Sequence, residues 1–507
     1  MGTHCLIGID IGTQGTKAAL FNEEGKCLAE AYKQSSLIQP EPGVTEEDPE
    51  EQVGAVCAAI RQLLEKSEQS PSSVAGVAID GQMAGIIGIG KEGLNITPYD
   101  SWLDTRCAPY ITRMSKEAGE KVLKKTGCAP SFNHGPKKLW WKHEHPEVYR
   151  KIAAFIQPGG YAVMRLCGLS SDEAFIDGSY LHFSGFADNK NSRWDEELCG
   201  IFDLAMEKLP RIVHSHEIVG KITADIAGVT GLLEGTPVAA GCGDTVASFL
   251  SCGALSRGIC VNVAGTSSPL AFTTGAFKAD SSQVLSCCQS PVPGLWYSYA
   301  YINGGGMNLE WFLKEITNIP GIEGRKNLTF DDLNRLAGAI KPREEDPVFI
   351  PHLAGRVSPA QPSLRGSWAG LTWSHGAGHL YRALLEGVAL EYGIYLDTLK
   401  SLYPESSPVE VRITGGGGRS DVWNQIKADV LGIPFVPLSR QGGAPMGMAL
   451  LAGKAVGIFD DLQKAADRWI VREQTVEADP EMYGFYRERL ERYGRLLSLL
   501  NEWAAEA

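Results

Sequence analysis

Short apolar runs that end in glycine-rich loops recur along the whole chain. They occupy residues 6–9, 74–79, 238–240, 258–263, 299–302 and 409–413. Longer segments with helical spacing lie between them, at 50–66, 380–402 and 423–431. Buried strands are short and continuously apolar, whereas helices need longer amphipathic segments, so this alternation predicts an α/β protein.

The two halves of the chain are similar near their beginnings. In each half a β-branched run ends in a loop that contains Gly-Thr, at Gly12-Thr13 and at Gly265-Thr266. Two matched positions suggest a duplicated scaffold, but they are equally compatible with accidental similarity. Because 507 residues exceed one ordinary core, we expect two domains, residues 1–250 and 251–507, that share a cleft.

Composition and charge disfavour several classes of partner. The formal net charge of −13 repels phosphate backbones and acidic membrane surfaces, so we expect neither nucleic acid nor a membrane as partner. No apolar run reaches the roughly 18 residues that a membrane helix needs. The scattered cysteines show no metal-ligand spacing, and the N-terminus lacks the pattern of a signal peptide, so we expect a cytoplasmic location.

The loop after the first apolar run has the composition of a phosphate site. Asp10 stands at the end of the run and is followed by Gly12, Thr13, Gln14 and Lys17. Glycines let backbone N–H groups approach oxyanions, Lys17 adds positive charge, and Asp10 can hold a hydrated Mg²⁺. A plain hairpin turn with a solvated lysine is the alternative interpretation.

Two later loops extend this interpretation. Gly265-Thr266 follows a second strand, and two Gly-Thr loops in one chain can hold a polyphosphate from both sides. The four glycines at 415–418 offer a flat surface on which a planar base can lie. Their alternative role is a flexible connection between a strand and a helix capped by Asp421.

A carboxylate and two polar segments are candidates for the chemistry. Asp244 stands among glycines and small residues, either as a helix N-cap or as the general base that a kinase acting on an alcohol needs. Gln82-Met83 offers an amide and an apolar surface, and Trp102 with Asp104 and Arg106 offers an aromatic platform with charges. Sugars need both kinds of contact, although a surface ion pair is the commoner explanation for Asp104 and Arg106.

In these motifs and their order, the chain resembles the FGGY family of carbohydrate kinases, and within it the xylulokinases. The resemblance extends over nearly the whole chain. Its further motifs are Pro42-Gly43, Glu46-Glu47-Asp48-Pro49, Gly135-Pro136-Lys137-Lys138-Leu139-Trp140, Gly366-Ser367-Trp368-Ala369-Gly370-Leu371, His379-Leu380 and Ala383-Leu384-Leu385-Glu386.

The resemblance implies a fold, a reaction and a site. The fold is a pair of RNase H-like domains, as in actin, hexokinase and Hsp70, around a deep cleft, with sugar mainly on the N-terminal and ATP and Mg²⁺ mainly on the C-terminal domain. The reaction transfers phosphate from ATP to a primary hydroxyl of a sugar. By position, catalysis falls to Asp244 and Asp10 (with Mg²⁺ through water), sugar binding to Gln82, Met83, Ala84 and Asp104, and nucleotide binding to Gly12, Thr13, Gln14, Lys17, Gly265, Thr266, Gly415, Gly416 and Ser420.

One position departs from the family pattern. Xylulokinases usually continue Gln-Met with His, whereas this chain has Ala84, which makes a smaller and less polar pocket wall. D-Xylulose is therefore the favoured substrate, with another ketopentose such as ribulose, a tetrulose or a glycerol-like polyol as alternatives. The sequence is compatible with a homodimer but does not determine the oligomeric state.

Two other classes of protein are less well supported. A non-enzymatic ATPase module of the same superfold, such as a chaperone, would carry a peptide-binding domain and not the sugar-side motifs. A dehydrogenase would need Gly-x-Gly-x-x-Gly followed about 20 residues later by an acid, and residues 8–17 lack that arrangement.

Overall fold

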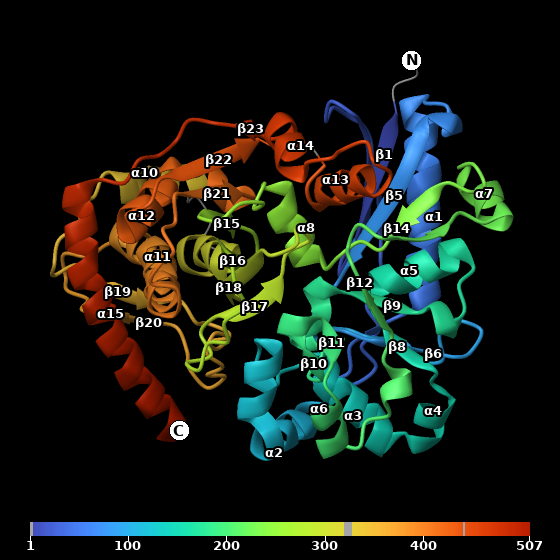
Figure 1. The fold of residues 1–507 in the computed structure, drawn as a ribbon. Helices are drawn as coiled ribbons and strands as arrows, with labels where there is room; N and C mark the ends of the chain where they lie inside the picture. The colour runs from blue at the N-terminus through green and yellow to red at the C-terminus, as the bar shows by residue number, and fades with distance from the viewer. Residues whose placement is uncertain (1–3, 319–326, 440–441, 507) are drawn as a thin grey trace.

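Two α/β lobes face each other across a cleft, and each is built around one large sheet (Figure 1). The computed structural model describes residues 4–318, 327–439 and 442–506. The first sheet contains, in spatial order, β13 (Ile218–Lys221), β14 (Pro237–Ala239), β5 (Val74–Gly81), β1 (Cys5–Gly12), β2 (Gly15–Asn22) and β3 (Cys27–Gln34). The second contains β17 (Ser286–Gln289), β18 (Trp296–Ile302), β16 (Ser268–Thr274), β15 (Ile259–Val263), β21 (Glu410–Thr414), β22 (Phe435–Ser439) and β23 (Val471–Arg472).

The two sheets repeat one topology, which confirms the predicted duplication. In the first, β1 pairs antiparallel with β2 and parallel with β5, and in the second β15 pairs antiparallel with β16 and parallel with β21. The outer strands match in the same way, since β3, β14 and β13 correspond in order and direction to β18, β22 and β23. The β1–β2 turn, which holds Thr13, and the β15–β16 turn, which holds Thr266, are therefore equivalent.

Two helices fill the space between the sheets. α8 (Asp244–Ser251) and α13 (Ala444–Ala455) pack against each other, with α13 on β1 and β5 and α8 on β1, β5 and β15 (Figure 1). A single apolar cluster joins Leu6 and Ala78 of the first sheet with Val261 and Ala271 of the second, through Val246 of α8 and residues of α13. The two halves of the chain therefore share part of their core.

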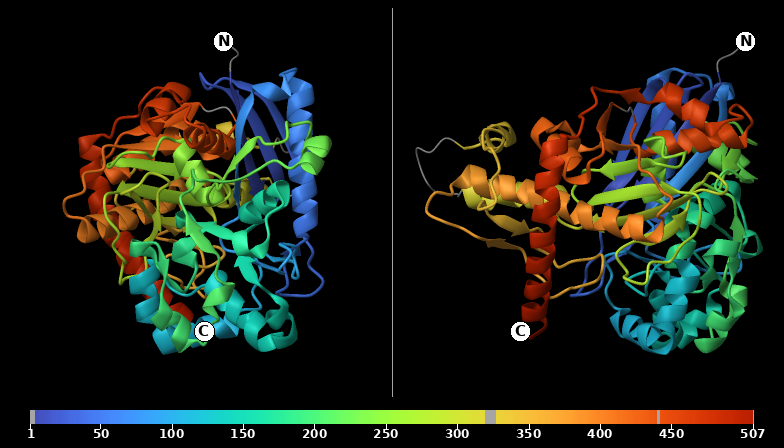
Figure 2. Two further views of the ribbon diagram at one scale, coloured as in Figure 1. Left: turned by 45° about the vertical axis from the view of Figure 1, so that its right-hand side comes forward. Right: turned by 60° about the vertical axis from the view of Figure 1, so that its left-hand side comes forward.

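Other helices cover the outer faces of the sheets. α1 (Pro49–Ser67) and α5 (Pro158–Cys167) pack on the first sheet, and α11 (Ala377–Leu402) and α12 (Asp421–Leu431) on the second. α15 (Pro480–Glu506) runs along the outside of the second lobe and ends in the C-terminus (Figures 1 and 2). None of the helices in the described residues is long and apolar enough to cross a membrane.

The remaining elements extend each lobe. The other α-helices are α2 (Ala108–Thr126), α3 (His134–Glu144), α4 (Pro146–Lys151), α6 (Glu196–Ile201), α7 (Ala224–Thr230), α9 (Gly305–Trp311), α10 (Phe330–Gly338) and α14 (Leu462–Trp469). Two-stranded pairs are β4 (Glu46–Glu47) with β7 (Tyr99–Asp100), β6 (Ile87–Ile89) with β8 (Ala154–Ile156), β9 (Phe175–Asp177) with β12 (Arg211–Val213), β10 (Ala187–Asp188) with β11 (Arg193–Trp194), and β19 (Val348–Ile350) with β20 (Ser367–Ala369).

The predicted elements form close to their expected positions, with one local correction. α1 begins where Asp48 accepts a hydrogen bond from Glu50 N and Pro49 occupies the first turn, as the Asp-Pro signal indicates. α12 is not capped by Asp421. Ser420 is its N-cap and accepts from Trp423 N, while Asp421 lies in the first turn and complements the helix dipole.

Gly8 marks the closest approach between the first sheet and α13. A Cβ at Gly8 would lie 1.8 Å from the carbonyl oxygen of Pro445 and 2.8 Å from the backbone nitrogen of Ala449. We expect Gly8→Ala to lower the free energy of unfolding by about 1–3 kcal/mol, because the helix must move off the sheet. Urea denaturation measures this. Gly54→Ala in α1 is the control. Among the described residues its Cβ would meet no neighbouring atom within 4 Å, so this substitution should stabilise the helix. Equal midpoints for the two variants would contradict the prediction.

Candidate active site

Three carboxyl groups converge where the strands of the first sheet meet α8. The parallel register of β1 and β5 places Asp10 beside Asp80. Gly81 then forms a bridge with Gly243, and this pairing starts α8 at Asp244. Burial, followed by the charge of Asp10, raises the pKa of Asp244 to about 7, and the same two causes raise the pKa of Asp80 well above its usual range.

Asp244 is partly exposed and is not the N-cap of α8. Gly243 is the N-cap of α8, and no side chain makes a capping hydrogen bond there, so the N-cap interpretation of Asp244 is wrong. The Oδ1 atom of Asp244 accepts hydrogen bonds from the backbone nitrogen of Thr245 at 2.6 Å and from its hydroxyl at 3.2 Å. A carboxyl group with a pKa near 7 can accept a proton at neutral pH.

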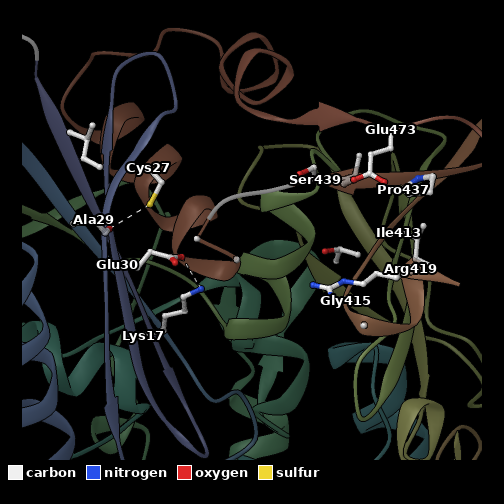
Figure 3. Close-up of a pocket in the computed structure, with 17 residues that line it drawn as sticks. Lys17, Cys27, Ala29, Glu30, Ile413, Gly415, Arg419, Pro437, Ser439 and Glu473 are labelled. Carbon is white, nitrogen blue, oxygen red and sulfur yellow. Dashed lines mark hydrogen bonds and ion pairs between the residues drawn. The ribbon is translucent and has the colours of Figure 1, made fainter. Parts of the chain in front are cut away.

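A cleft of about 820 Å³ separates the β2–β3 hairpin from the second lobe (Figure 3). Lys17 and Glu30 line one wall, and Gly415, Gly416 and Arg419 line the other. Lys17 is not merely solvated, because its Nζ forms an ion pair with Glu30 at 3.0 Å. The predicted phosphate loop is a tight β1–β2 turn, in which Gly12 pairs with Gly15 around Thr13 and Gln14.

A second cavity of about 460 Å³ lies against the glycine turn at residues 415–418, which also borders the first cavity. Gly265, Thr266, Gly416 and Ser420 line it together with Asn334, whose Oδ1 accepts a hydrogen bond from the Ser420 hydroxyl at 3.2 Å. The four glycines are not an unstructured connection, because residues 416–419 form one 3₁₀ turn. Gly416 and Arg419 line both cavities, so the two cavities meet at the glycine turn. Six predicted nucleotide residues therefore lie in or around this turn, namely Lys17, Gly265, Thr266, Gly415, Gly416 and Ser420.

The residues predicted for the sugar lie on the first lobe. Gln82 is buried, its Nε2 donates to Glu47 at 2.8 Å, and its Oε1 accepts from the Thr13 hydroxyl at 3.2 Å. Both ends of its amide are therefore engaged within the protein. Met83 packs against Gly243, next to Asp244, and Ala84 is partly exposed.

Asp104 and Arg106 belong to a largely buried network of four charged residues, so the surface ion pair is the wrong interpretation. Arg106 contacts Asp104 at 2.9 Å, Asp100 at 3.0 Å and Glu46 at 2.7 Å, and its guanidinium lies 4.4 Å from the ring centroid of Trp140. Asp104 is 2% exposed and also accepts from Thr45 N at 2.9 Å. One cation thus joins the 43–47 segment to the loop that carries Trp102.

Asp80 and Glu47 are site residues that the sequence did not predict. Asp80 directly follows the predicted strand 74–79. Its position at a strand end was the available signal, because a parallel sheet can place such an acid beside Asp10. Glu47 lies within a family motif, but nothing local indicates that its carboxylate would be buried beneath Gln82.

Comparisons with known proteins cover almost all of the chain. Models of the N-terminal and C-terminal domains of the FGGY family of carbohydrate kinases match residues 5–251 and 260–456. The xylulose kinase of Bacillus subtilis is 29% identical over 471 residues, 92% of this chain and 91% of that protein. The gluconokinase of Bacillus licheniformis is 28% identical, over 92% of this chain and 90% of that protein. The crystal structure of xylulose kinase from Rhodospirillum rubrum matches with a TM-score of 0.90 and 26% identity, over 99% of this chain and 100% of that one.

We expect Arg106→Ala to lower the free energy of unfolding by about 3–5 kcal/mol, because it leaves buried carboxylates without their cation. Burial already raises the pKa of Asp100 to about 7. Asp100 is largely neutral at pH 5.5 and ionised at pH 8, so the loss should be smaller at pH 5.5. Urea denaturation at both values tests this. Arg113→Ala, which removes a surface pair with Glu117, is the control and should cost about 0–1 kcal/mol; a similar loss in both variants would contradict the prediction.

Proposed function

The chain belongs to the FGGY family of carbohydrate kinases, and we propose that it transfers the γ-phosphoryl group of ATP to a primary hydroxyl of D-xylulose. The family match confirms the expected class, an ATP-dependent sugar phosphotransferase with the fold of actin, hexokinase and Hsp70. The observation that carries the proposed mechanism is the place of Asp244. It starts the helix between the two sheets, beside Met83 of the sugar side, with its pKa raised to about 7.

In the proposed reaction Asp244 takes the proton of the attacking sugar hydroxyl. The hydroxyl oxygen forms a bond to the γ-phosphorus as the bond from that phosphorus to ADP breaks. Lys17 and residues 265–266, which line the two cavities, donate to the phosphates together with the equivalent turn at 12–14, while Gly415, Gly416 and Ser420 contact the adenosine. Closure of the lobes excludes water, which would otherwise accept the phosphoryl group.

We also propose that Mg²⁺ acts beside Asp10, held through water. The donor set fits this ion, because the carboxyl groups here offer oxygen alone and repel one another. Across residues 4–318, 327–439 and 442–506, no three acidic, His or Cys side chains are arranged to hold a metal by themselves. Mg²⁺ commonly keeps its waters and uses one or two carboxylates with substrate phosphates. Bound there, it would neutralise charge on the transferring phosphate.

Since ATP is made inside cells, we propose a cytoplasmic location.

The xylulose kinases of B. subtilis and R. rubrum support D-xylulose as substrate, whereas the gluconokinase relative and Ala84 favour testing alternatives. Release of ADP should be measured with D-xylulose, D-ribulose, D-erythrulose, glycerol and gluconate, and without any acceptor. We expect the highest kcat/KM with D-xylulose. A higher kcat/KM with another acceptor would identify that acceptor as the preferred substrate in place of D-xylulose. Release of ADP at the same rate without any acceptor would favour an ATPase module.

We expect Asp244→Asn to lower kcat by about 10²- to 10⁴-fold with little change in the affinities for ATP and sugar, because the amide cannot accept the proton. The melting temperature should not fall, since the Oδ1 atom of Asn can accept the same two hydrogen bonds from Thr245. In the unmutated enzyme kcat/KM should rise with pH through about 7, as the carboxyl group ionises. Asp225→Asn, in the first turn of α7 and exposed, is the control. Near-normal turnover of Asp244→Asn would exclude its role as base.

Position 84 allows a test of specificity because its neighbours are held in place. His134 Nε2 hydrogen-bonds to the Met83 carbonyl, and a Cβ at Gly85 would lie 2.2 Å from the Tyr99 ring. We expect Ala84→His to raise kcat/KM for D-xylulose relative to the other acceptors about three- to tenfold, through one added hydrogen bond. Ala84→Leu adds bulk without that bond and serves as the control. The prediction fails if the unmutated enzyme already prefers D-xylulose by orders of magnitude and Ala84→His weakens that preference.

A further inference from the structure

A chain of hydrogen bonds leads from the partly exposed sugar side to a buried carboxylate. Trp102 Nε1 donates to the Thr13 hydroxyl at 2.9 Å, this hydroxyl donates to Gln82 Oε1 at 3.2 Å, and Gln82 Nε2 donates to Glu47 Oε1 at 2.8 Å. The indole is 44% exposed and the carboxylate 1%. These four residues come from separate segments, namely the loop after β7, the β1–β2 turn, the position directly after β5, and β4.

The carboxylate sets the direction of every bond in this chain. Both oxygens of Glu47 accept, one from Gln82 and the other from Gln52 Nε2 at 2.9 Å. Since both oxygens accept from amide donors, the NH₂ end of Gln82 faces the carboxylate and its carbonyl end faces Thr13. The Thr13 hydroxyl then donates its one hydrogen bond to Gln82 and accepts a hydrogen bond from the indole N–H of Trp102.

The chain therefore fixes one side-chain conformation on each side of the site. Thr13 lies in the turn proposed to bind phosphate, and Trp102 lies in the loop proposed as the sugar platform. Rotation of the Thr13 hydroxyl away from this position breaks two bonds together. A ligand that contacts Thr13 or Trp102 in this conformation also stabilises the conformation of the other residue through the chain, so the second ligand binds to a turn or a platform that is held more firmly.

We propose that Glu47 is a positioning residue whose chain through Gln82 and Thr13 to Trp102 makes sugar and nucleotide strengthen each other's binding. This inference rests on the proposed function, which assigns the sugar to the Trp102 side and the phosphates to the turn at Thr13. Coupling of this kind is reciprocal, so it can be measured from either ligand.

The test is the ratio of the Kd of D-xylulose without and with the non-hydrolysable analogue AMP-PNP, measured by calorimetry on the full-length enzyme. The unmutated enzyme should give a ratio well above one. Glu47→Leu, which removes the anchor, and Trp102→Phe, which removes the N–H but keeps an aromatic face, should each lower the ratio about three- to tenfold. The Kd of AMP-PNP alone should change less than about twofold in both.

Glu47→Gln tests whether the hydrogen bonds of Glu47, and not only its packing, carry the coupling. The new amide can present its oxygen to Gln82 and its NH₂ to Gln52. The Oε1 atom of Gln52 is buried, has no hydrogen-bond partner within the part of the chain that the structure describes, and can turn to accept from this NH₂. This variant should therefore keep most of the coupling. Glu51→Gln, at an exposed position of α1, is the matched control and should keep all of it.

A ratio of one in the unmutated enzyme, or an undiminished ratio in Glu47→Leu, would overturn the proposal. If Glu47→Leu does not fold, Trp102→Phe decides between the same outcomes. Failure of D-xylulose to bind would instead contradict the proposed substrate. The ratio would then be measured with the acceptor that gives the highest kcat/KM in the ADP assay, so the two failures remain distinguishable.

Discussion

The packing of α8 and α13 between two sheets is the constraint on which the rest of the structure depends. Each sheet has an apolar face that must be buried, and these two helices bury both faces with residues such as Val246, Phe249 and Met448. The helix α8 can begin only where the pairing of Gly81 with Gly243 ends. Asp244 is consequently placed at the junction of the two lobes by the requirements of core packing.

The carboxyl groups of the first lobe fall into two sets with different environments. Asp100, Asp104 and Glu46 share Arg106, so their charges are offset and they hold loops together. Asp244 and Asp80 instead face Asp10, and burial with this like charge raises their pKa values. Burial without an offsetting cation is unfavourable for stability, and it is the environment that prepares a carboxyl group for proton transfer.

The duplicated topology explains why the site lies between the lobes. Equivalent turns after β1 and β15 carry Thr13 and Thr266, and equivalent parallel neighbours, β5 and β21, end directly before Gln82 and directly before the glycine turn at 415–418. The two copies have diverged in the segments that come directly after these strands. After β5 come Met83 and Ala84 of the sugar side, whereas after β21 come Gly415 and Gly416 of the nucleotide side.

The sequence by itself determined the α/β class, the family and most strand ends, because apolar runs, Gly-Thr turns and the Asp-Pro start of α1 act within a few residues. Only the tertiary structure decided what the polar groups do. Asp80 meets Asp10 through strand register, Gln82 is engaged at both ends of its amide, Gly243 takes the N-cap position from Asp244, and Arg106 lies among three carboxylates. Register, burial and hydrogen-bond direction depend on partners far away in the chain, and no local pattern of residues encodes them.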